Sequence, residues 1–337
     1  MKSYHLRPGA GIDGLTVREH DVPEPAPGQV LVRVRATSLS LRELLVLDGD
    51  YPLPVLPDTI PGCAGAGEVV AIGAGVTRFG PGDRVAATVF PDWIDGPFAP
   101  AYAAQLGSSR DGMLTEYALV DERGLVRLPA HLSYEEAATL PLTAVTAWHA
   151  LTGGRPVVAG ETVLTLGTGG VSLFALQLAK VAGARVIATT SSPDKAERLR
   201  ALGADEVVDY RVTPAWGEEV RRITGGRGVD RVVDIAGDLA QSLAATALGG
   251  EIAFVGHWLG TDAGSPSLSA SAFFTAGAVL RPLAVGSRAR FEALNRAVGT
   301  WGLRPSIHRE FGFDEVPDAL RYYRKGGFVG NVVIGHG

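Results

Sequence analysis

The chain has 337 residues, of which 46% are hydrophobic and 20% charged, and a net charge of −5. This length favours two domains, and the acidic balance offers no basic surface for nucleic acid. The sequence contains no apolar run of about 18 residues, the length needed to cross a membrane, and the N-terminus lacks the apolar core of a signal peptide. We therefore expect a cytoplasmic protein that uses neither nucleic acid nor a membrane as a partner.

The first part of the chain, residues 1–127, reads as short strands joined by glycine-rich turns. Residues 29–39 alternate apolar and polar positions, the period of a half-buried strand, and residues 65–88 contain two more strands. Residues 91–112 are rich in proline, glycine and aromatic residues and have no clear period. This lobe is compatible with a functional lid and equally with a surface excursion that has no role.

The middle part, residues 128–285, alternates strands and helices, which indicates a parallel sheet. Residues 162–167 form a short buried strand, and an amphipathic helix follows over 171–183. A second helix over 192–203 carries its own boundary signals, with Ser192 as the N-cap and proline at its first position. The last strand of this sheet is expected within 278–287. The tail then returns with two helices and a closing strand over 331–335.

A glycine-rich turn connects the first of these strands to its helix. Gly167, Gly169 and Gly170 would let the backbone approach a pyrophosphate, and the helix beginning near Val171 would offer its free N–H groups. Ser172 stands where the third glycine of GxGxxG is expected, so the motif is imperfect. The flanking strand and helix nevertheless predict a dinucleotide site. The alternative is a glycine turn that serves only helix–sheet packing.

The end of the next strand decides which dinucleotide is expected. An NAD site places a carboxylate there for the ribose 2′-hydroxyl, whereas this chain has a run of hydroxyls that ends in Ser191 and Ser192. Hydroxyls can donate to a 2′-phosphate, and Lys195 and Arg198 add positive charge one helical turn apart. We therefore predict NADPH. The alternative is that Ser192 only caps its helix and the two cations are solvated.

Several segments together resemble the medium-chain dehydrogenase/reductase superfamily over essentially the full chain. They are GAGEVVAIGAGVTRFGPGDRV, DGMLTEYALV, EEAATLPLTAVTAWHAL, GTGGVSLFALQLAK, ALGADEVVDYR and GFVGNVVI. The chain looks most similar to the zinc-free branch of quinone oxidoreductases and enoyl reductases. The resemblance implies an α/β protein in which residues 1–127 and 286–337 form a GroES-like catalytic domain and residues 128–285 a Rossmann domain. It also implies a homodimer.

The resemblance locates the positions of the zinc ligands found elsewhere in the superfamily. Those positions hold Ser40, Cys63 followed by Ala64, and Leu142, which do not make a catalytic zinc site. The lobe over 91–112 corresponds to the structural-zinc region and contains no cysteine. Cys63 is the chain's one cysteine, and the seven histidines show no HxH or HxxxH pairing, so we predict no metal.

By the same comparison, further residues contact the cofactor, with Thr146 near the nicotinamide and Asn331 replacing a lysine of the closing motif. The residues expected at the cofactor are Thr146, Gly167, Gly169, Gly170, Val171, Ser191, Ser192, Lys195, Tyr210, Val255, Gly256, Val285 and Asn331.

Without a metal, the electrophile must itself be activated, so we expect hydride transfer from NADPH to a small to medium-sized apolar enone, enoyl compound or quinone. The catalytic candidates are Tyr51, Ser40, Cys63 and His257. Each has a structural alternative: Tyr51 packing in a turn, Ser40 and Cys63 filling the place of former ligands, and His257 making a plain hydrogen bond. A metal-free carbonyl or imine reductase and a non-catalytic NADPH-binding protein remain the alternative functions.

Overall fold

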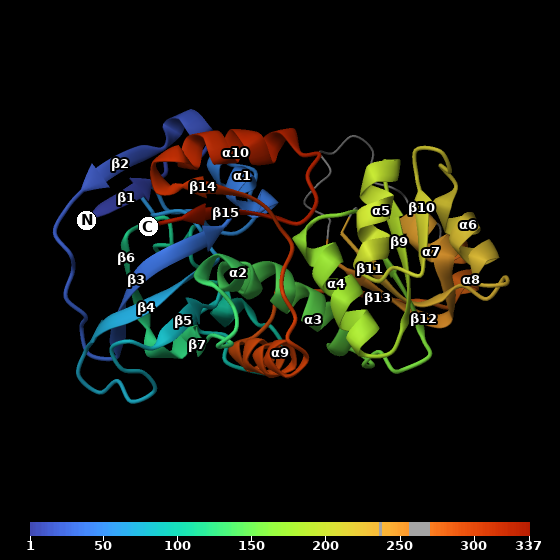
Figure 1. The fold of residues 1–337 in the computed structure, drawn as a ribbon, viewed down its shortest axis with the longest axis horizontal. Coiled ribbons are helices and arrows are strands. Elements are labelled where there is room, and N and C mark those ends of the chain that lie inside the picture. The colour runs from blue at the N-terminus through green and yellow to red at the C-terminus, as the bar shows by residue number, and fades with distance from the viewer. Residues whose placement is uncertain (236–237, 256–269) are drawn as a thin grey trace. The chain divides into compact units, whose positions relative to one another are not determined.

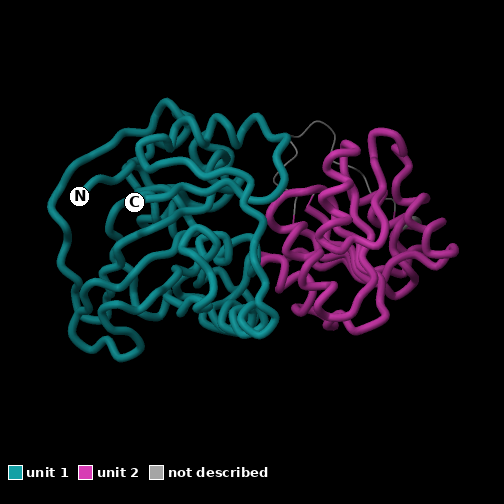
Figure 2. The backbone as a smooth tube through the Cα atoms, in the orientation of Figure 1, with its two compact units in different colours: residues 1–145, 285–337 teal, residues 146–284 magenta. Residues whose placement is uncertain are grey.

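A computed structural model describes residues 1–235, 238–255 and 270–337, which divide into two compact units (Figures 1 and 2). Unit 1 comprises residues 1–145 and 285–337, and unit 2 comprises residues 146–284. The first boundary lies 18 residues later than the 127/128 boundary read from the sequence. The reason is that helix α2 (Tyr134–Ala138) packs against strands of the unit 1 sheet. Gly256 and His257 lie outside the described residues.

Unit 1 is built on a seven-stranded, mainly antiparallel sheet in the order β14-β15-β3-β4-β5-β7, with β6 also paired to β3; a separate hairpin joins β1 to β2. The alternating residues of β3 place valines on the buried face, as the sequence predicted. The strands are β1 (Lys2–His5), β2 (Thr16–Glu19), β3 (Gln29–Ser38), β4 (Gly65–Ile72), β5 (Arg84–Ala87), β6 (Tyr117–Asp121), β7 (Leu125–Arg127), β14 (Ile307–Gly312) and β15 (Asn331–Gly335).

Residues 1–127, which the sequence analysis read as strands and turns, also contain a helix. It is α1 (Leu41–Asp48), which packs beside α10 (Val316–Lys325) and buries its apolar side chains in one cluster with β15. The remaining helical segments are α2, the π-helical turn η4 (Leu140–Ala144), α9 (Arg288–Trp301), α10 (Val316–Lys325) and the short turns η1 (Ile12–Gly14), η2 (Pro100–Tyr102), η3 (Glu122–Gly124) and η6 (Phe313–Glu315).

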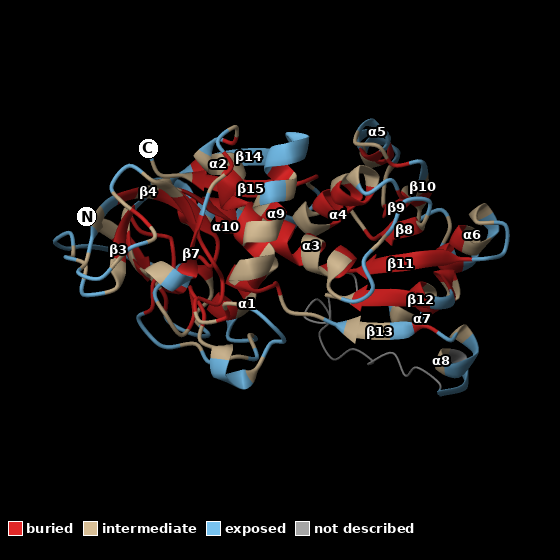
Figure 3. Ribbon diagram, turned by 90° about the horizontal axis from the view of Figure 1, so that it is seen from below, coloured by how far each residue is buried: buried red, intermediate tan, exposed pale blue. Residues whose placement is uncertain are grey.

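Unit 2 is a six-stranded parallel sheet in the order β10-β9-β8-β11-β12-β13, as the strand–helix alternation predicted. The inner strands are buried on both faces (Figure 3). Its strands are β8 (Thr162–Thr165), β9 (Arg185–Thr190), β10 (Glu206–Asp209), β11 (Val229–Asp234), β12 (Thr246–Phe254) and β13 (Val279–Pro282). Its helices are α3 (Val145–Thr152), α4 (Gly170–Val181), α5 (Pro193–Ala201), α6 (Trp216–Ile223), α7 (Leu239–Ala245) and α8 (Ala270–Ala276).

The last strand of this sheet is shorter than the sequence suggested, since β13 ends at Pro282 and the chain crosses back to unit 1 at residue 285. Among the helices that the structure describes, none is both long and apolar enough to span a bilayer.

Candidate functional site

The glycine-rich turn of unit 2, where the sequence predicts a pyrophosphate site, joins β8 to α4. Gly167 has a φ of 76°, a conformation that favours glycine, and its N–H donates to the Thr189 hydroxyl at 3.1 Å. The Ser172 hydroxyl donates to the Leu166 carbonyl at 2.6 Å and so ties the first turn of α4 to the end of β8. A serine can therefore stand in the place of the third glycine while helix and strand remain tightly joined.

The end of β9 carries hydroxyls and no carboxylate. The Ser192 side chain caps α5 by accepting from the Lys195 N–H at 3.5 Å, as predicted. Thr190 is 1% exposed, and its hydroxyl oxygen has no hydrogen-bond partner in the part of the chain that the structure describes. The Tyr210 N–H donates to the Thr190 carbonyl at 3.0 Å. An unpartnered buried hydroxyl beside half-buried serines and a half-buried lysine suits a polar ligand such as a nucleotide ribose or phosphate.

Most of the predicted cofactor residues of unit 2 follow the carboxyl ends of neighbouring parallel strands. The turn after β8, the start of α5 after β9, Tyr210 after β10 and Val255 after β12 all lie at this edge of the sheet. The Val255 N–H donates to the Asp234 carbonyl at 2.8 Å, which continues the pairing of β11 with β12. Ligands of open parallel sheets bind at this edge.

Three predicted cofactor residues lie near the chain crossings or in unit 1. Thr146 and Val285 are the first residues after the two crossings between the units, and both are buried. Asn331 opens β15, where its side-chain oxygen accepts from the Thr143 hydroxyl at 3.2 Å and its amide donates to the Ser306 carbonyl at 3.1 Å. The Asn331 amide therefore already serves the packing of unit 1, and its contact with a cofactor stays a prediction.

In unit 1, the carboxylate of Glu43 accepts hydrogen bonds from two of the segments that the sequence analysis compared with zinc-ligand positions. Glu43 is 1% exposed and accepts from the Ser40 N–H at 2.8 Å, the Ser40 hydroxyl at 2.5 Å and the Cys63 N–H at 3.2 Å. Ser40 and Glu43 thus form a capping box at the start of α1. The structure brings two predicted residues, Ser40 and Cys63, together around this carboxylate.

These residues do not fit a catalytic zinc ion. The Ser40 hydroxyl is engaged by Glu43, and Leu142 offers no ligand atom. Burial, and after it the neighbouring Glu43 carboxylate, raises the pKa of the Cys63 thiol, which opposes the thiolate that zinc requires. Among the described residues, no group of three or more His, Cys, Asp and Glu side chains is arranged to hold a metal ion.

Arg42 links this cluster to Tyr51 and to the lobe. Its Nε–H donates to Gln105 Oε1 at 3.2 Å, and its Nη2 donates to the Leu106 carbonyl and the Ser108 hydroxyl, both at 3.0 Å. The Tyr51 hydroxyl donates to the same Gln105 oxygen at 3.0 Å, and the Arg42 guanidinium lies 4.8 Å from the Tyr51 ring centroid. Sequence reasoning missed Gln105, because a single glutamine in an aperiodic segment gives no local signal.

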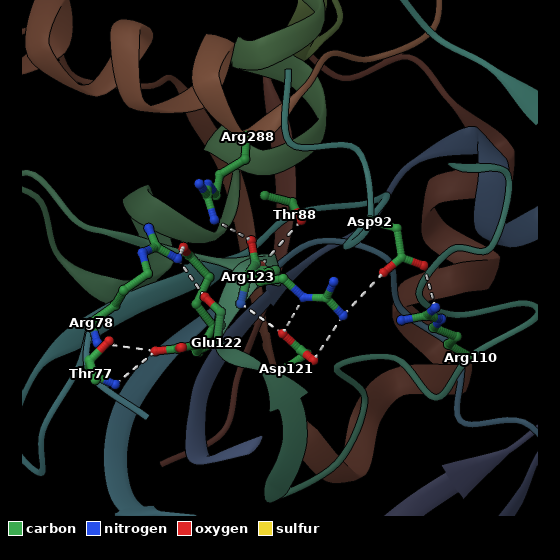
Figure 4. Close-up of polar contacts among 11 residues, drawn as sticks. Thr77, Arg78, Thr88, Asp92, Arg110, Asp121, Glu122, Arg123 and Arg288 are labelled. Carbon is green, nitrogen blue, oxygen red and sulfur yellow. Dashed lines mark hydrogen bonds and ion pairs between the residues drawn. The ribbon is translucent and has the colours of Figure 1, made fainter. Parts of the chain in front are cut away.

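An ion pair joins the two ends of the lobe over residues 91–112, and its first end is also tied to the rest of unit 1 (Figure 4). Within the lobe Asp92 pairs with Arg110. Asp92 also lies 3.9 Å from Arg123, which in turn pairs at 3.0 Å with Asp121, the last residue of β6. The N–H groups of residues 288 and 289, at the start of α9, donate to backbone carbonyls of the lobe. Arg42 holds the second half of the lobe by its hydrogen bonds to residues 105–108, and Gln105 connects the lobe to Tyr51.

Comparisons with known proteins agree with this arrangement. Residues 26–130 match the family described as "Alcohol dehydrogenase GroES-like domain", and residues 170–299 match "Zinc-binding dehydrogenase". The chain is 37% identical to a zinc-type alcohol dehydrogenase-like protein of Schizosaccharomyces pombe, over 96% of each chain. It is 35% identical to the acryloyl-coenzyme A reductase of Metallosphaera sedula, over 72% of this chain and 74% of that one. A crystal structure titled NAD-dependent alcohol dehydrogenase superposes over 100% of both chains with a TM-score of 0.89 and 35% identity.

Proposed function

The chain belongs to the medium-chain dehydrogenase/reductase superfamily of oxidoreductases, and from this premise we propose that it is a zinc-independent, NADPH-dependent reductase of activated C=C bonds or quinones. The observation that carries the proposal is the capping box at Glu43. Its carboxylate holds Ser40 and Cys63 by hydrogen bonds in the segments where the resemblance expects metal ligands.

Unit 2 supplies the groups that would hold the nucleotide. The Gly167 turn and the N-terminus of α4 present N–H groups suited to a pyrophosphate. The buried Thr190 hydroxyl, Ser191 and Lys195 suit a phosphorylated ribose better than a bare one, since no carboxylate stands at the end of β9. When bound, the reduced nicotinamide supplies the hydride.

Unit 1 supplies polar groups for the acceptor. Negative charge develops on the oxygen of an enone or quinone as hydride arrives, and polar protein groups can stabilise it without a Lewis acid. Of the three described catalytic candidates, Ser40 is committed to Glu43 and Cys63 is fully buried, whereas Tyr51 is partly exposed. We therefore propose that Tyr51 contacts the substrate and that Ser40 and Cys63 have structural roles. The proposed role of His257 lies outside the described residues.

Fluorescence titration with NADPH and NADH tests the cofactor assignment. We expect tighter binding of NADPH, and Lys195→Glu should weaken it by at least about tenfold, or about 1.4 kcal/mol, because it places a carboxylate near the 2′-phosphate. Binding of NADH should change much less. Lys325→Glu, at the end of α10 in unit 1, is a matched control that should bind both cofactors as the wild type does.

Steady-state oxidation of NADPH by 1,4-naphthoquinone and by cyclohex-2-enone tests the reaction. Turnover with either acceptor supports the proposal. Oxidation by simple aldehydes alone would instead favour a metal-free carbonyl reductase, the activity closest to the alcohol dehydrogenase names among the relatives. Tight NADPH binding without any acceptor would point to a non-catalytic role.

A further inference from the structure

We propose that Arg42 and Gln105 are positioning residues for Tyr51, fixing the plane of its ring and turning its hydroxyl proton toward the Gln105 amide. The inference rests on the proposed function, because that function assigns Tyr51 to the substrate. Neither positioning residue needs to touch the substrate, since both act through the tyrosine.

The polarity of the hydrogen bonds follows from the chemistry of arginine. A guanidinium has only donors, so the Gln105 atom that faces Arg42 Nε at 3.2 Å must be the side-chain oxygen. The same oxygen faces the Tyr51 hydroxyl at 3.0 Å, so the tyrosine must donate its only proton to it. Arg42 therefore sets the orientation of the amide, and the amide sets the direction of the phenol proton.

The ring is held by the same arginine. The Arg42 guanidinium lies 4.8 Å from the Tyr51 ring centroid, within the range of a cation–π contact. Burial opposes the charge on Arg42, but nearby Cys63, Tyr51 and Glu43 outweigh it and raise the guanidinium pKa. Because Arg42 is also anchored to Leu106 and Ser108, the ring cannot turn without displacing a buried charge.

A functional consequence follows for the hydroxyl of Tyr51. In this arrangement its proton is already donated to Gln105, so Tyr51 offers the substrate an oxygen lone pair and contacts it as a hydrogen-bond acceptor, not as the donor that stabilises the developing negative charge. The lobe that contributes Gln105 therefore decides whether the Tyr51 hydroxyl donates or accepts a hydrogen bond at the substrate, although the lobe begins 40 residues later in the sequence.

A double-mutant cycle with Tyr51→Phe and Gln105→Met separates positioning from general damage. If Gln105 acts through Tyr51, Gln105→Met should lower kcat/KM for cyclohex-2-enone by about tenfold with Tyr51 present and by less than about twofold in the Tyr51→Phe background. Gln105→Glu should stay within about threefold of wild type, because a carboxylate oxygen accepts both hydrogen bonds. Equal losses from Gln105→Met in the two backgrounds would overturn the proposal.

A second readout needs no turnover. In protein labelled with ¹³Cζ-tyrosine, eight signals are expected, and the one that vanishes in Tyr51→Phe belongs to Tyr51. Gln105→Met should shift this signal. Arg42→Lys, which keeps the charge but removes the Nε donor, should shift it as well. Gln29→Met is the matched control: it removes a glutamine oxygen that accepts from the Ala26 N–H at 3.1 Å elsewhere in unit 1, and it should leave the Tyr51 signal in place.

The two readouts keep the proposal apart from the function on which it rests. If no acceptor oxidises NADPH, the proposed function fails, while the Tyr51 signal still reports whether Gln105 and Arg42 hold the ring. An unchanged Tyr51 signal in folded Gln105→Met protein would refute the positioning pair whatever the turnover. If Gln105→Met does not fold, Arg42→Lys makes the same comparison, with Gln105→Glu as the variant that keeps both hydrogen bonds and should leave the Tyr51 signal close to its wild-type position.

Discussion

Replacement of Glu43 by glutamine removes one charge and turns one acceptor into a donor while hardly changing the volume. Glu43 Oε2 accepts two hydrogen bonds from Ser40, and Oε1 accepts one from the Cys63 N–H. With the glutamine oxygen toward Ser40, the new NH₂ group faces the Cys63 N–H and leaves that buried donor unpaired, at about 1–3 kcal/mol. The two Ser40 bonds lose charge assistance, about 1 kcal/mol each, so the sum is about 3–5 kcal/mol.

Equilibrium urea unfolding followed by far-UV circular dichroism measures this loss. Glu136→Gln is the matched control, because Glu136 forms the same Ser-x-x-Glu capping box with Ser133 at the start of α2. The partners in that box are more exposed. Even with the loss of the ion pair that Glu136 makes to Arg304 at the surface, the variant should lose only about 1–2 kcal/mol of unfolding free energy. Equal losses in the two variants would refute the reasoning, because burial of the Glu43 carboxylate is what separates them.

Three further outcomes follow from other groups. Glu251 in unit 2 pairs with Arg231, which is 0% exposed, at 3.1 Å and with Arg281 at 2.6 Å. Glu251→Gln should therefore lower the unfolding free energy by about 3–5 kcal/mol in the same assay. Glu219→Gln, which breaks a surface pair, should lower it by under about 1 kcal/mol. Burial lowers the pKa of His336 to about 4 from its usual 6.5, so its contribution to stability is complete above pH 6.5 and lost as the pH falls toward 4; melting temperatures from pH 7 to 4 should fall less in His336→Gln than in wild type. Dialysis against EDTA and 1,10-phenanthroline should leave both turnover and melting temperature unchanged, and a loss of either that added zinc restores would overturn the metal-free assignment.

Local signals in the sequence were sufficient for much of unit 2. The glycine turn after β8, the N-cap and first-turn proline of α5 and the parallel alternation of strands and helices all depend on neighbours within a few residues. The motif segments were likewise specific enough to identify the superfamily, which the matches over residues 26–130 and 170–299 confirm. The absence of a carboxylate at the end of β9 can also be read directly from the chain.

Helix α1 shows where local signals were insufficient. It spans only eight residues, and two of its charged residues, Arg42 and Glu43, are buried against the usual preference of such side chains for solvent. Their burial is possible because Gln105, Leu106 and Ser108 supply acceptors to Arg42 from 63 to 66 positions away. Nothing near Arg42 and Glu43 in the chain indicates those partners, so the sequence analysis assigned these two residues no role.

By itself, the sequence determined the superfamily and the parallel sheet with its glycine-rich turn, because residue type and short-range spacing encode both. Only the tertiary structure decided that Glu43 joins Ser40 to Cys63, that Gln105 reaches Tyr51 and that α2 belongs to unit 1. The physical reason is that a buried polar side chain must find its hydrogen-bond partners wherever the fold places them, and in this chain those partners come from distant segments.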